Sequence, residues 1–164
     1  MRRADREDYD WLFRASYPRI RRTVASIVRS PEIAENITQE AFFKLLQKWR
    51  TVSAFDRPDA WVRRVAIRLA VRYVTRESGR AAVEATASTL PPPESDVDLG
   101  NAIGVLPPMQ RAAVVMHHFD DLPVADIARI LVVSESTVKQ HLYRARHRLA
   151  DLLGEEVAAD DVHR

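Results

Sequence analysis

The sequence of 164 residues contains no cysteine, only four glycines and no long apolar run. The lack of cysteine excludes a disulfide framework, a thiolate metal site and a cysteine nucleophile. Neither GxGxxG nor GxxxxGK(S/T) occurs, which excludes the glycine-rich phosphate loops. No apolar run approaches the ~18 residues of a membrane helix, and the N-terminus MRRADREDYDW lacks the apolar stretch of a signal peptide. We therefore expect a cytoplasmic protein with no membrane insertion, no bound metal and no cofactor.

The formal net charge of +2 conceals a strong segregation of charge along the chain. Residues 1–80 carry 18 basic and 10 acidic side chains, and residues 99–150 carry six and four. Between these blocks, residues 81–98 hold four acids and no base, and residues 151–164 hold five acids and one base. Two basic blocks with an acidic spacer and an acidic tail indicate a polyanion-binding protein, although a basic helix face is also often merely solvated.

A proline-rich segment divides the sequence into two modules. Residues 81–98, AAVEATASTLPPPESDVD, combine small, polar and acidic residues with three consecutive prolines, which disfavour a helix. On both sides of this segment apolar residues recur at helical spacing, and no alternating strand pattern of useful length occurs. We therefore predict an all-α protein of two small helical domains, residues 1–80 and 99–153, joined by a Pro-rich acidic linker and followed by an acidic tail, residues 154–164.

Three long helices are predicted in the first module. In the first of them Pro18 predicts a kink or a restart. Residues 30–32, Ser-Pro-Glu, then provide the cap, the proline and the acid of a helix start. Residues 50–57 are predicted to form a loop, and Pro58 to open a third helix that continues through Glu77. The core stripe expected on this third helix is Trp61, Val62, Val65, Leu69 and Tyr73.

The third helix also carries a stripe of arginines at four-residue steps, namely Arg64, Arg68, Arg72 and Arg76. Like charges at this spacing repel each other and destabilise an isolated helix, so an external anion explains them better than the helix itself does. Arg57 extends this basic surface, and Phe55 in the adjoining loop is the aromatic ring best placed for a base. Trp49 and Trp61 lie on apolar stripes, where core packing is expected. Aromatic rings beside a basic groove are typical of single-strand binding.

The second module is also predicted to be helical, with helices at residues 99–105, 109–119 and 124–131 and a fourth helix that Ser134 caps. The last two helices and their short connection form a helix-turn-helix pattern. A helix of this kind fits the major groove, and an ordinary helical hairpin with a basic face remains the alternative. The outer side of the last helix displays Ser136, Thr137, Lys139, Gln140, Tyr143, Arg144, Arg146 and Arg148.

Three segments, in this order, resemble the extracytoplasmic-function group of the bacterial sigma-70 family. In PEIAENITQEAFFKLLQKW the residues that match a family motif are Ala34, Glu35, Gln39, Glu40 and Phe42. In DAWVRRVAIRLAVRYVTR they are Trp61, Ala66 and Arg76. In the segment from Leu106 to Leu153 they are Leu106, Pro107, Arg111, Ile127, Ala128, Thr137, Val138, Lys139, Arg144, Ala145, Arg146 and Leu149.

The resemblance implies a sigma factor that directs core RNA polymerase to promoters and melts promoter DNA. It implies binding to the β′ clamp helices and the β flap of core polymerase, with the clamp helices docking on Glu35, Asn36, Gln39 and Glu40. The residues implied for the melted minus-ten strand are Phe55, Arg57, Trp61, Arg64, Arg68, Arg72 and Arg76. Those implied for the minus-thirty-five duplex are Ser136, Thr137, Lys139, Gln140, Tyr143, Arg144 and Arg146. An anti-sigma factor is implied as a further partner.

The sequence departs from the family pattern at four positions. Arg68 and Arg72 stand where the family usually has Asn and Asp, Val132 replaces the glycine of the turn, and Asn36 replaces an Asp. These changes predict more phosphate-like contacts at the minus-ten strand, an altered turn and one charge fewer toward polymerase.

Two other functions compete with the sigma factor. A stand-alone helix-turn-helix regulator with an N-terminal interaction domain would bind duplex DNA tightly without polymerase. An enzyme would need a metal site at residues 117–121, where two histidines and two aspartates occur. Adjacent histidines point to different faces of a helix and no third spaced ligand accompanies them, so we expect no enzymatic activity.

Overall fold

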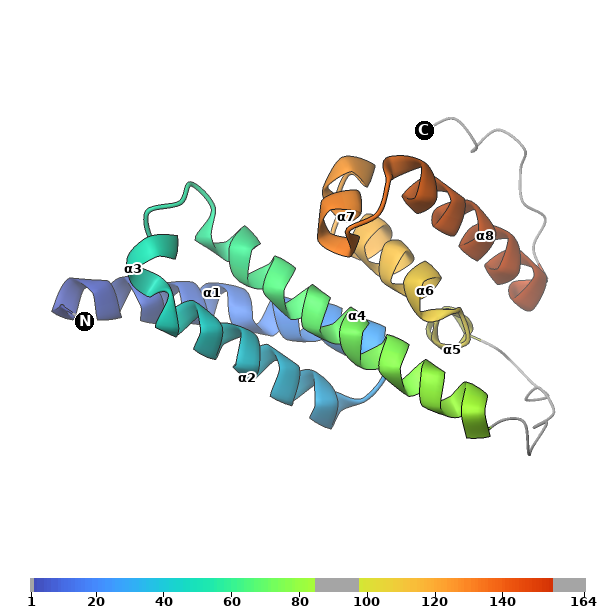
Figure 1. Cartoon of the computed structure of the whole chain (residues 1–164), viewed down its shortest axis with the longest axis horizontal. Helices are drawn as coiled ribbons and strands as arrows, with labels where there is room; N and C mark the ends of the chain where they lie inside the picture. The colour runs from blue at the N-terminus through green and yellow to red at the C-terminus, as the bar shows by residue number, and fades with distance from the viewer. Residues whose placement is uncertain (1, 85–97, 155–164) are drawn as a thin grey trace. The chain divides into compact units, whose positions relative to one another are not determined.

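The computed structural model describes residues 2–84 and 98–154, with the backbone alone for residues 81–84 (Figure 1). Most of the expected linker and nearly all of the expected acidic tail lie outside these residues. The regular structure in the described stretches is entirely helical, as predicted, and includes no strand. The chain forms two compact units, Met1–Arg72 and Tyr73–Arg164, so the division falls inside α4 (Pro58–Glu84). No helix within the described stretches is long and apolar enough to cross a bilayer.

The first helix, α1 (Arg3–Val28), is continuous, so a restart at Pro18 is a wrong prediction. A proline inside a helix removes the hydrogen bond to the carbonyl four residues earlier, which here belongs to Arg14. Because Pro18 is exposed, water can hydrate that carbonyl and the helix survives. The helix ends at Arg29, whose φ of 62° is left-handed and whose N–H donates to the carbonyl of Ala25.

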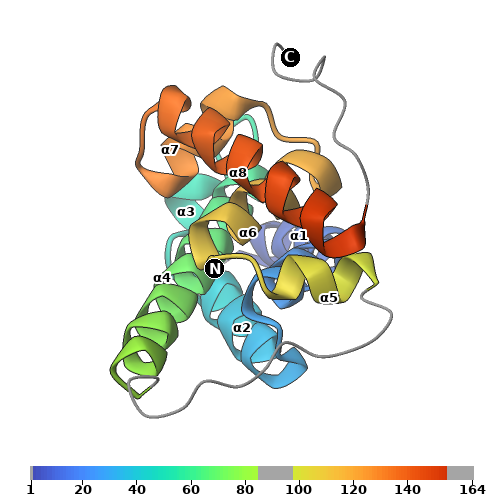
Figure 2. The ribbon, with the colours of Figure 1, turned by 90° about the vertical axis from the view of Figure 1, so that its right-hand side faces the viewer.

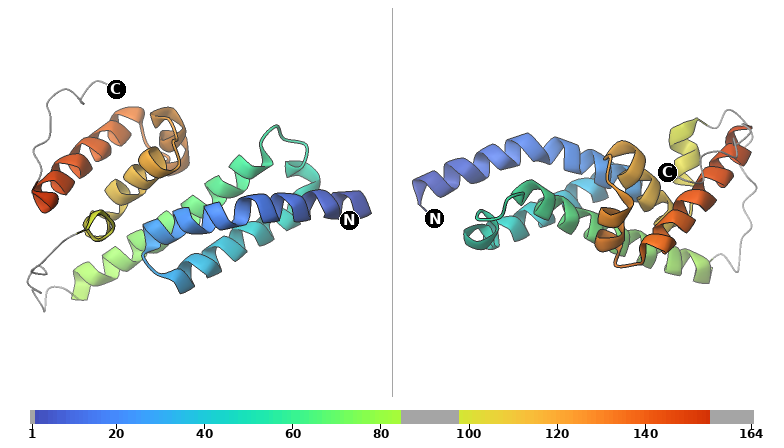
Figure 3. Two further views of the ribbon diagram at one scale, coloured as in Figure 1. Left: turned by 180° about the vertical axis from the view of Figure 1, so that it is seen from behind. Right: turned by 90° about the horizontal axis from the view of Figure 1, so that it is seen from above.

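The second helix, α2 (Pro31–Gln47), begins as predicted. The Ser30 hydroxyl accepts a hydrogen bond from the N–H of Ile33 at 3.3 Å, and Pro31 occupies the first helical position. Figure 3 shows α1 and α2 as an antiparallel hairpin, and the small side chains of Ala34 and Ala41 are fully buried in it. The buried hydroxyl of Thr38 is satisfied by the carbonyl of Ala34 at 2.7 Å.

A short helix, α3 (Trp49–Val52), occupies the start of the predicted loop, so the loop prediction is wrong for residues 50–52. Trp49 and Val52 are buried, which explains why these residues form a helical turn against the core instead of an exposed loop. The remaining residues, 53–57, connect α3 to α4.

The fourth helix, α4, extends past the predicted end at Glu77 to Glu84, and its buried face differs from the predicted stripe. Among the five predicted residues only Val62 is fully buried, and the other four are half-buried. The face that packs inward consists of Val62, Ala66, Ile67, Ala70 and Val74. Alanines carry a weak hydrophobic signal in a sequence, which explains why this face was not predicted.

The second unit begins with the last part of α4 and continues with α5 (Leu99–Gly104), α6 (Pro108–Val114), a π-helical segment η2 (Val115–Phe119), α7 (Val124–Leu131) and α8 (Glu135–Leu153). In this unit α8 packs against α5, α6 and α7 (Figure 2). The buried guanidinium of Arg111 donates from Nη1 to the carbonyls of Gly104 at 2.9 Å and Leu106 at 3.3 Å. These bonds satisfy two carbonyls at and beyond the end of α5 and fix the start of α6.

The helix predicted over residues 109–119 is α-helical only to Val114 and then widens into η2. A π-helical segment accommodates an extra residue in a helix, and it is rare enough that apolar spacing alone does not signal it. At its end Nδ1 of His117 lies 3.0 Å from the carbonyl of Leu122 and donates to it, which closes the turn toward α7.

Candidate functional site

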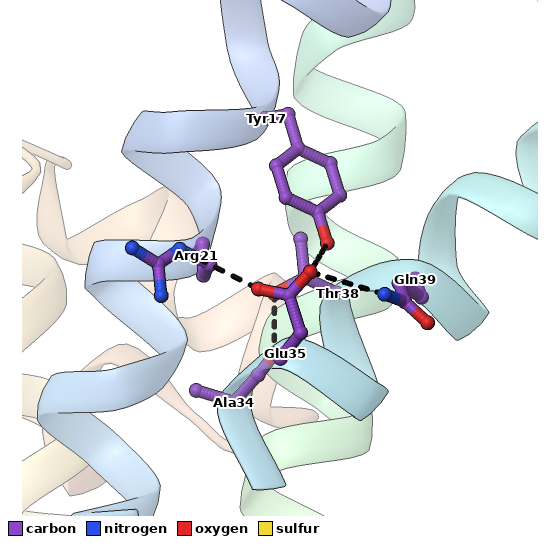
Figure 4. A network of polar contacts seen from close by, with 6 residues as sticks. All are labelled: Tyr17, Arg21, Ala34, Glu35, Thr38 and Gln39. Atoms are coloured by element: carbon purple, nitrogen blue, oxygen red, sulfur yellow. Dashed lines mark hydrogen bonds and ion pairs between the residues drawn. The ribbon is translucent and has the colours of Figure 1, made fainter. Parts of the chain in front are cut away.

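A hydrogen-bonded network joins the predicted polymerase-facing side of α2 to α1 (Figure 4). The Tyr17 hydroxyl donates to Glu35 Oε1 at 2.5 Å, and Gln39 Nε2 donates to the same oxygen at 3.0 Å. On the other side of the carboxylate, Arg21 Nε lies 3.6 Å from Glu35 Oε2. Glu35 is therefore held by side chains from both helices.

This network shifts the titration of two of its members. Burial raises the pKa of Tyr17 to about 12, with its hydrogen bond to the Glu35 carboxylate acting in the same direction. The hydrogen bonds from Tyr17 and Gln39 lower the pKa of Glu35, and the nearby charge of Arg21 also lowers it. Both shifts favour the state in which the phenol is protonated and the carboxylate is charged.

The four residues predicted on this side of α2 therefore differ in their availability. Gln39 and Glu40 are exposed, as is Asn36, whereas Glu35 is half-buried between the helices. Tyr17 and Arg21 were not predicted as site residues. Their contact with Glu35 depends on how α1 and α2 align, and local sequence patterns do not reveal that alignment.

Residues 53–57, between α3 and α4, present an aromatic ring beside a fixed ion pair. Phe55 is 46% exposed, as expected, whereas Trp49 is only 5% exposed and belongs to the core. The Arg57 guanidinium donates in bidentate fashion to Asp59, with Nε at 3.0 Å from Oδ1 and Nη2 at 2.8 Å from Oδ2. This pair lowers the pKa of Asp59 and raises the pKa of Arg57. Arg57 is thus positioned at the start of α4.

The predicted arginine stripe follows α4, but its members differ in exposure. Arg68 and Arg72 are exposed in the first unit, and Arg76 is exposed on the part of α4 that belongs to the second unit. Arg64 and the aromatic ring of Trp61 are half-buried at the start of the helix, and the buried Nε of Arg64 has no hydrogen-bond partner in the described part of the chain.

The helix-turn-helix forms as predicted from α7, residues 132–134 and α8. Ala128 is buried, which permits close approach of the two helices, and Ser134 Oγ accepts from the N–H of Thr137 at 3.1 Å. The turn residue Val132 has φ 58° and ψ 49°, which is the left-handed region that a glycine would adopt without steric cost. Val132 therefore occupies the turn in a backbone conformation that is strained for a residue with a Cβ.

Most of the predicted groove-reading residues lie on the solvent side of α8, where Ser136, Lys139, Gln140, Tyr143 and Arg144 are exposed. Thr137 and Arg146 are half-buried, and the Thr137 hydroxyl lies 2.8 Å from Ser134 Oγ within the helix cap. The structure thus places five of the seven predicted residues on the outer face and two at its margin.

The histidines and aspartates of residues 117–121 do not come together as a metal site. Within residues 2–84 and 98–154 no group of three or more His, Cys, Asp or Glu is arranged to hold a metal ion. The His117 and His118 rings meet edge to face at 4.9 Å, and His117 bonds to the backbone carbonyl of Leu122.

Both units match a known family. The family model for Sigma-70 region 2 matches residues 12–80, and that for Sigma-70, region 4 matches residues 96–149. The sequence is 33% identical over 159 residues to the ECF RNA polymerase sigma factor SigM of Mycobacterium tuberculosis, covering 92% of this chain and 79% of the relative. It is 28% identical over 166 residues to the RNA polymerase sigma-E factor of Streptomyces coelicolor, covering 94% and 89% of the two chains.

Two solved structures share the fold. The first is the sigma factor RpoE from Bartonella quintana in complex with the anti-sigma factor NepR, with a TM-score of 0.69 at 20% identity, covering 92% of this chain and 99% of that one. The second is CnrH in complex with the cytosolic domain of CnrY, with a TM-score of 0.61 at 19% identity and coverage of 91% and 89%.

Proposed function

The chain belongs to the sigma-70 family and is an RNA polymerase sigma factor of the extracytoplasmic-function type, and from that premise we propose which surfaces perform each step of promoter recognition. The match of both regions in the order region 2 then region 4 carries this conclusion. It replaces the alternative of a stand-alone helix-turn-helix regulator, which would not need a region 2.

The first module, residues 1–80, binds core polymerase in this proposal. The exposed side chains of Asn36, Gln39 and Glu40 offer hydrogen bonds to the β′ clamp helices, and Glu35 keeps α2 aligned with α1 through Tyr17. The same module holds the melted minus-ten strand. Phe55 provides a ring for a base, and the α4 arginines provide charge for the phosphates.

The second module, residues 99–153, reads the minus-thirty-five duplex and faces the β flap. Support comes from the exposed row on α8, in which Lys139, Gln140 and Arg144 can reach base edges while Ser136 and Tyr143 can bond to phosphates. Residues 81–98 link the two modules inside the polymerase complex.

An anti-sigma factor is proposed as the regulatory partner, because one of the solved structures described above holds the anti-sigma factor NepR and the other holds the cytosolic domain of CnrY. A sigma factor is a regulatory subunit rather than a catalyst. We accordingly assign the chain no reaction of its own, and we place it in the cytoplasm, where promoter DNA and polymerase are found.

Run-off transcription tests the proposal. Purified chain is combined with core polymerase on a pool of genomic promoter fragments, and the transcripts are sequenced. Initiation from a subset of promoters that share an upstream and a minus-ten element is expected. The proposal is wrong if no fragment is transcribed while a known sigma factor succeeds with the same core polymerase and the same pool.

A further inference from the structure

The outward face of α1 lies apart from the surfaces assigned above and combines an exposed aromatic ring with unopposed positive charge. Residues 11–31 contain five arginines, no lysine and no acidic residue, whereas residues 1–10 contain four acids. The indole of Trp11 is 72% exposed, the largest exposure of an aromatic side chain in the described part of the chain. An exposed tryptophan next to a run of arginines is unusual for a surface that only meets water.

Helical geometry places this ring and Arg22 on one side of α1. At ~3.6 residues per turn, Arg22 lies about three turns after Trp11, so the two point the same way. Arg14 lies in the next turn after Trp11, about 60° to one side. Arg29 follows at the end of the helix, about 27 Å along the axis from Trp11 at ~1.5 Å per residue. All four side chains are exposed.

Internal contacts do not account for these arginines. In residues 2–84 and 98–154 the side chains of Arg14, Arg22 and Arg29 form no ion pair, unlike Arg21, which lies 3.6 Å from Glu35. The helix dipole favours cations only within the last turn of a helix, and the last turn of α1 contains no basic residue. The positive charge of Arg14 and Arg22 is therefore not offset from within the described part of the chain.

We propose that this face of α1, formed by Trp11, Arg14, Arg22 and Arg29, binds a segment of single-stranded DNA. One nucleotide base stacks on the exposed indole, and the guanidinium groups pair with successive phosphates along the helix. A single strand is favoured over a duplex because the face of a nucleotide base is open for stacking only when it is unpaired. The planar fork of arginine suits phosphate, and every basic residue from position 11 to position 31 is an arginine. The inference rests on the proposed function in one respect: the single-stranded DNA comes from the promoter that the sigma factor melts.

Fluorescence anisotropy of a labelled 15-nucleotide oligothymidine, titrated with the full-length chain at several salt concentrations, tests the proposal. Trp11→Ala is expected to weaken binding roughly 5- to 100-fold through loss of stacking. The double variant Arg22→Gln/Arg29→Gln is expected to lower the slope of log K against log salt by about 1.4, since each phosphate contact contributes about 0.7. The matched control is Arg3→Gln/Arg6→Gln on the first turns of the same helix, which should leave both quantities unchanged.

Four results would overturn the proposal. The first two are no binding of the oligothymidine by the unmodified chain and an equal effect of the control pair. The other two are a loss of duplex affinity in Trp11→Ala as large as its loss of single-strand affinity, and a loss of affinity for core polymerase in Trp11→Ala with oligothymidine binding intact. The last result would assign the face to a protein. Run-off transcription by the unmodified chain separates the two claims, because a chain that fails to initiate but binds the single strand through α1 contradicts the proposed function alone.

Discussion

At Val132 a β-branched residue occupies a left-handed turn, with φ 58° and a side chain that is 78% exposed. An L-residue loses about 1–2 kcal/mol in this conformation, and the exposed valine makes little contact that would offset the loss. We predict that Val132→Gly stabilises the second unit by about 1 kcal/mol after the greater flexibility of glycine in the unfolded chain is included. Urea unfolding measures the change. Val132→Ala, which keeps a Cβ in the same conformation, is the control and should give a much smaller gain. Equal stability of Val132→Gly and the unmodified chain would contradict the claim that the backbone at Val132 is strained.

The contact between Tyr17 and Glu35 predicts a pH dependence with two limits. The pKa of Tyr17 is raised, so its contribution to stability is present below the ordinary tyrosine pKa of ~10 and is lost as pH rises toward about 12. The pKa of Glu35 is lowered, so its contribution is present above the ordinary ~4.3 and is lost as pH falls through the lowered value. Tyr17→Phe should reduce the alkaline loss and raise the pKa of Glu35.

Thermal unfolding followed by circular dichroism checks the alkaline limit, and a carbon NMR titration of the Glu35 carboxyl checks the acid one. Tyr9→Phe serves as the control for the Glu35 titration, because Tyr9 donates to the carbonyl of Phe42 and not to Glu35. An unchanged Glu35 titration in Tyr17→Phe would show that the hydrogen bond seen between α1 and α2 does not persist in solution.

On the scale of an element, α4 is expected to contribute charge rather than base recognition. We predict that Arg68→Ala and Arg72→Ala each weaken formation of the open promoter complex and lower its salt dependence by about 0.7 for each phosphate that the variant no longer pairs with. The promoter sequence preference should stay the same, because phosphate contacts carry no sequence information. Permanganate footprinting over a salt series measures opening. Open-complex formation that does not change at any salt concentration would remove α4 from the minus-ten contact.

The outer face of α8 is expected to behave in the opposite way. Lys139→Ala and Arg144→Ala should change which upstream elements are chosen, and discrimination at one base position should fall by about 1–3 kcal/mol for each side chain that reads a base. Selection from a randomised minus-thirty-five element, followed by sequencing, measures the preference. A uniform decrease over all sequences would mean that the side chain contacts phosphate only.

The elements also show how far the sequence alone can lead. Caps, proline positions and apolar spacing predicted α2, α7 and α8, since these signals act within a few residues. The continuity of α1 through Pro18, the buried alanines of α4 and the π-helical segment were not predicted. Pro18 is tolerated because it is exposed, the alanines carry a weak hydrophobic signal, and a π-helical segment has no distinct apolar spacing. The same limit applies to the candidate site. Exposure of Phe55 and of the α8 row could be predicted from spacing, whereas the engagement of Glu35 by Tyr17 required the alignment of two helices.

For the whole molecule, the separation of charge predicts a restraint on DNA binding before polymerase is bound. Residues 81–98 carry four acids and no base between two modules rich in arginine. Acidic residues near a basic surface lower its positive potential and compete with phosphates over about one Debye length, ~10 Å at 0.1 M salt. We predict that Glu94→Gln/Asp96→Asn raises the affinity of the chain without polymerase for non-specific duplex DNA several-fold at low salt. Anisotropy of a labelled duplex without promoter elements measures it.

The predicted rise in DNA affinity should be electrostatic, and it should depend on where in the sequence the neutralised acids lie. The rise in affinity is expected to vanish near ~0.5 M salt, because screening then acts within a few ångströms. No other effect is expected, since the substitutions keep the size and polarity of both side chains. The paired variant Glu155→Gln/Glu156→Gln changes the net charge equally but in the acidic tail, and it therefore separates a general rise in charge from the position of the spacer. Equal gains from both variants would mean that only net charge matters. A larger gain from the spacer variant would show that the acids between the modules lower the DNA affinity of the chain without polymerase.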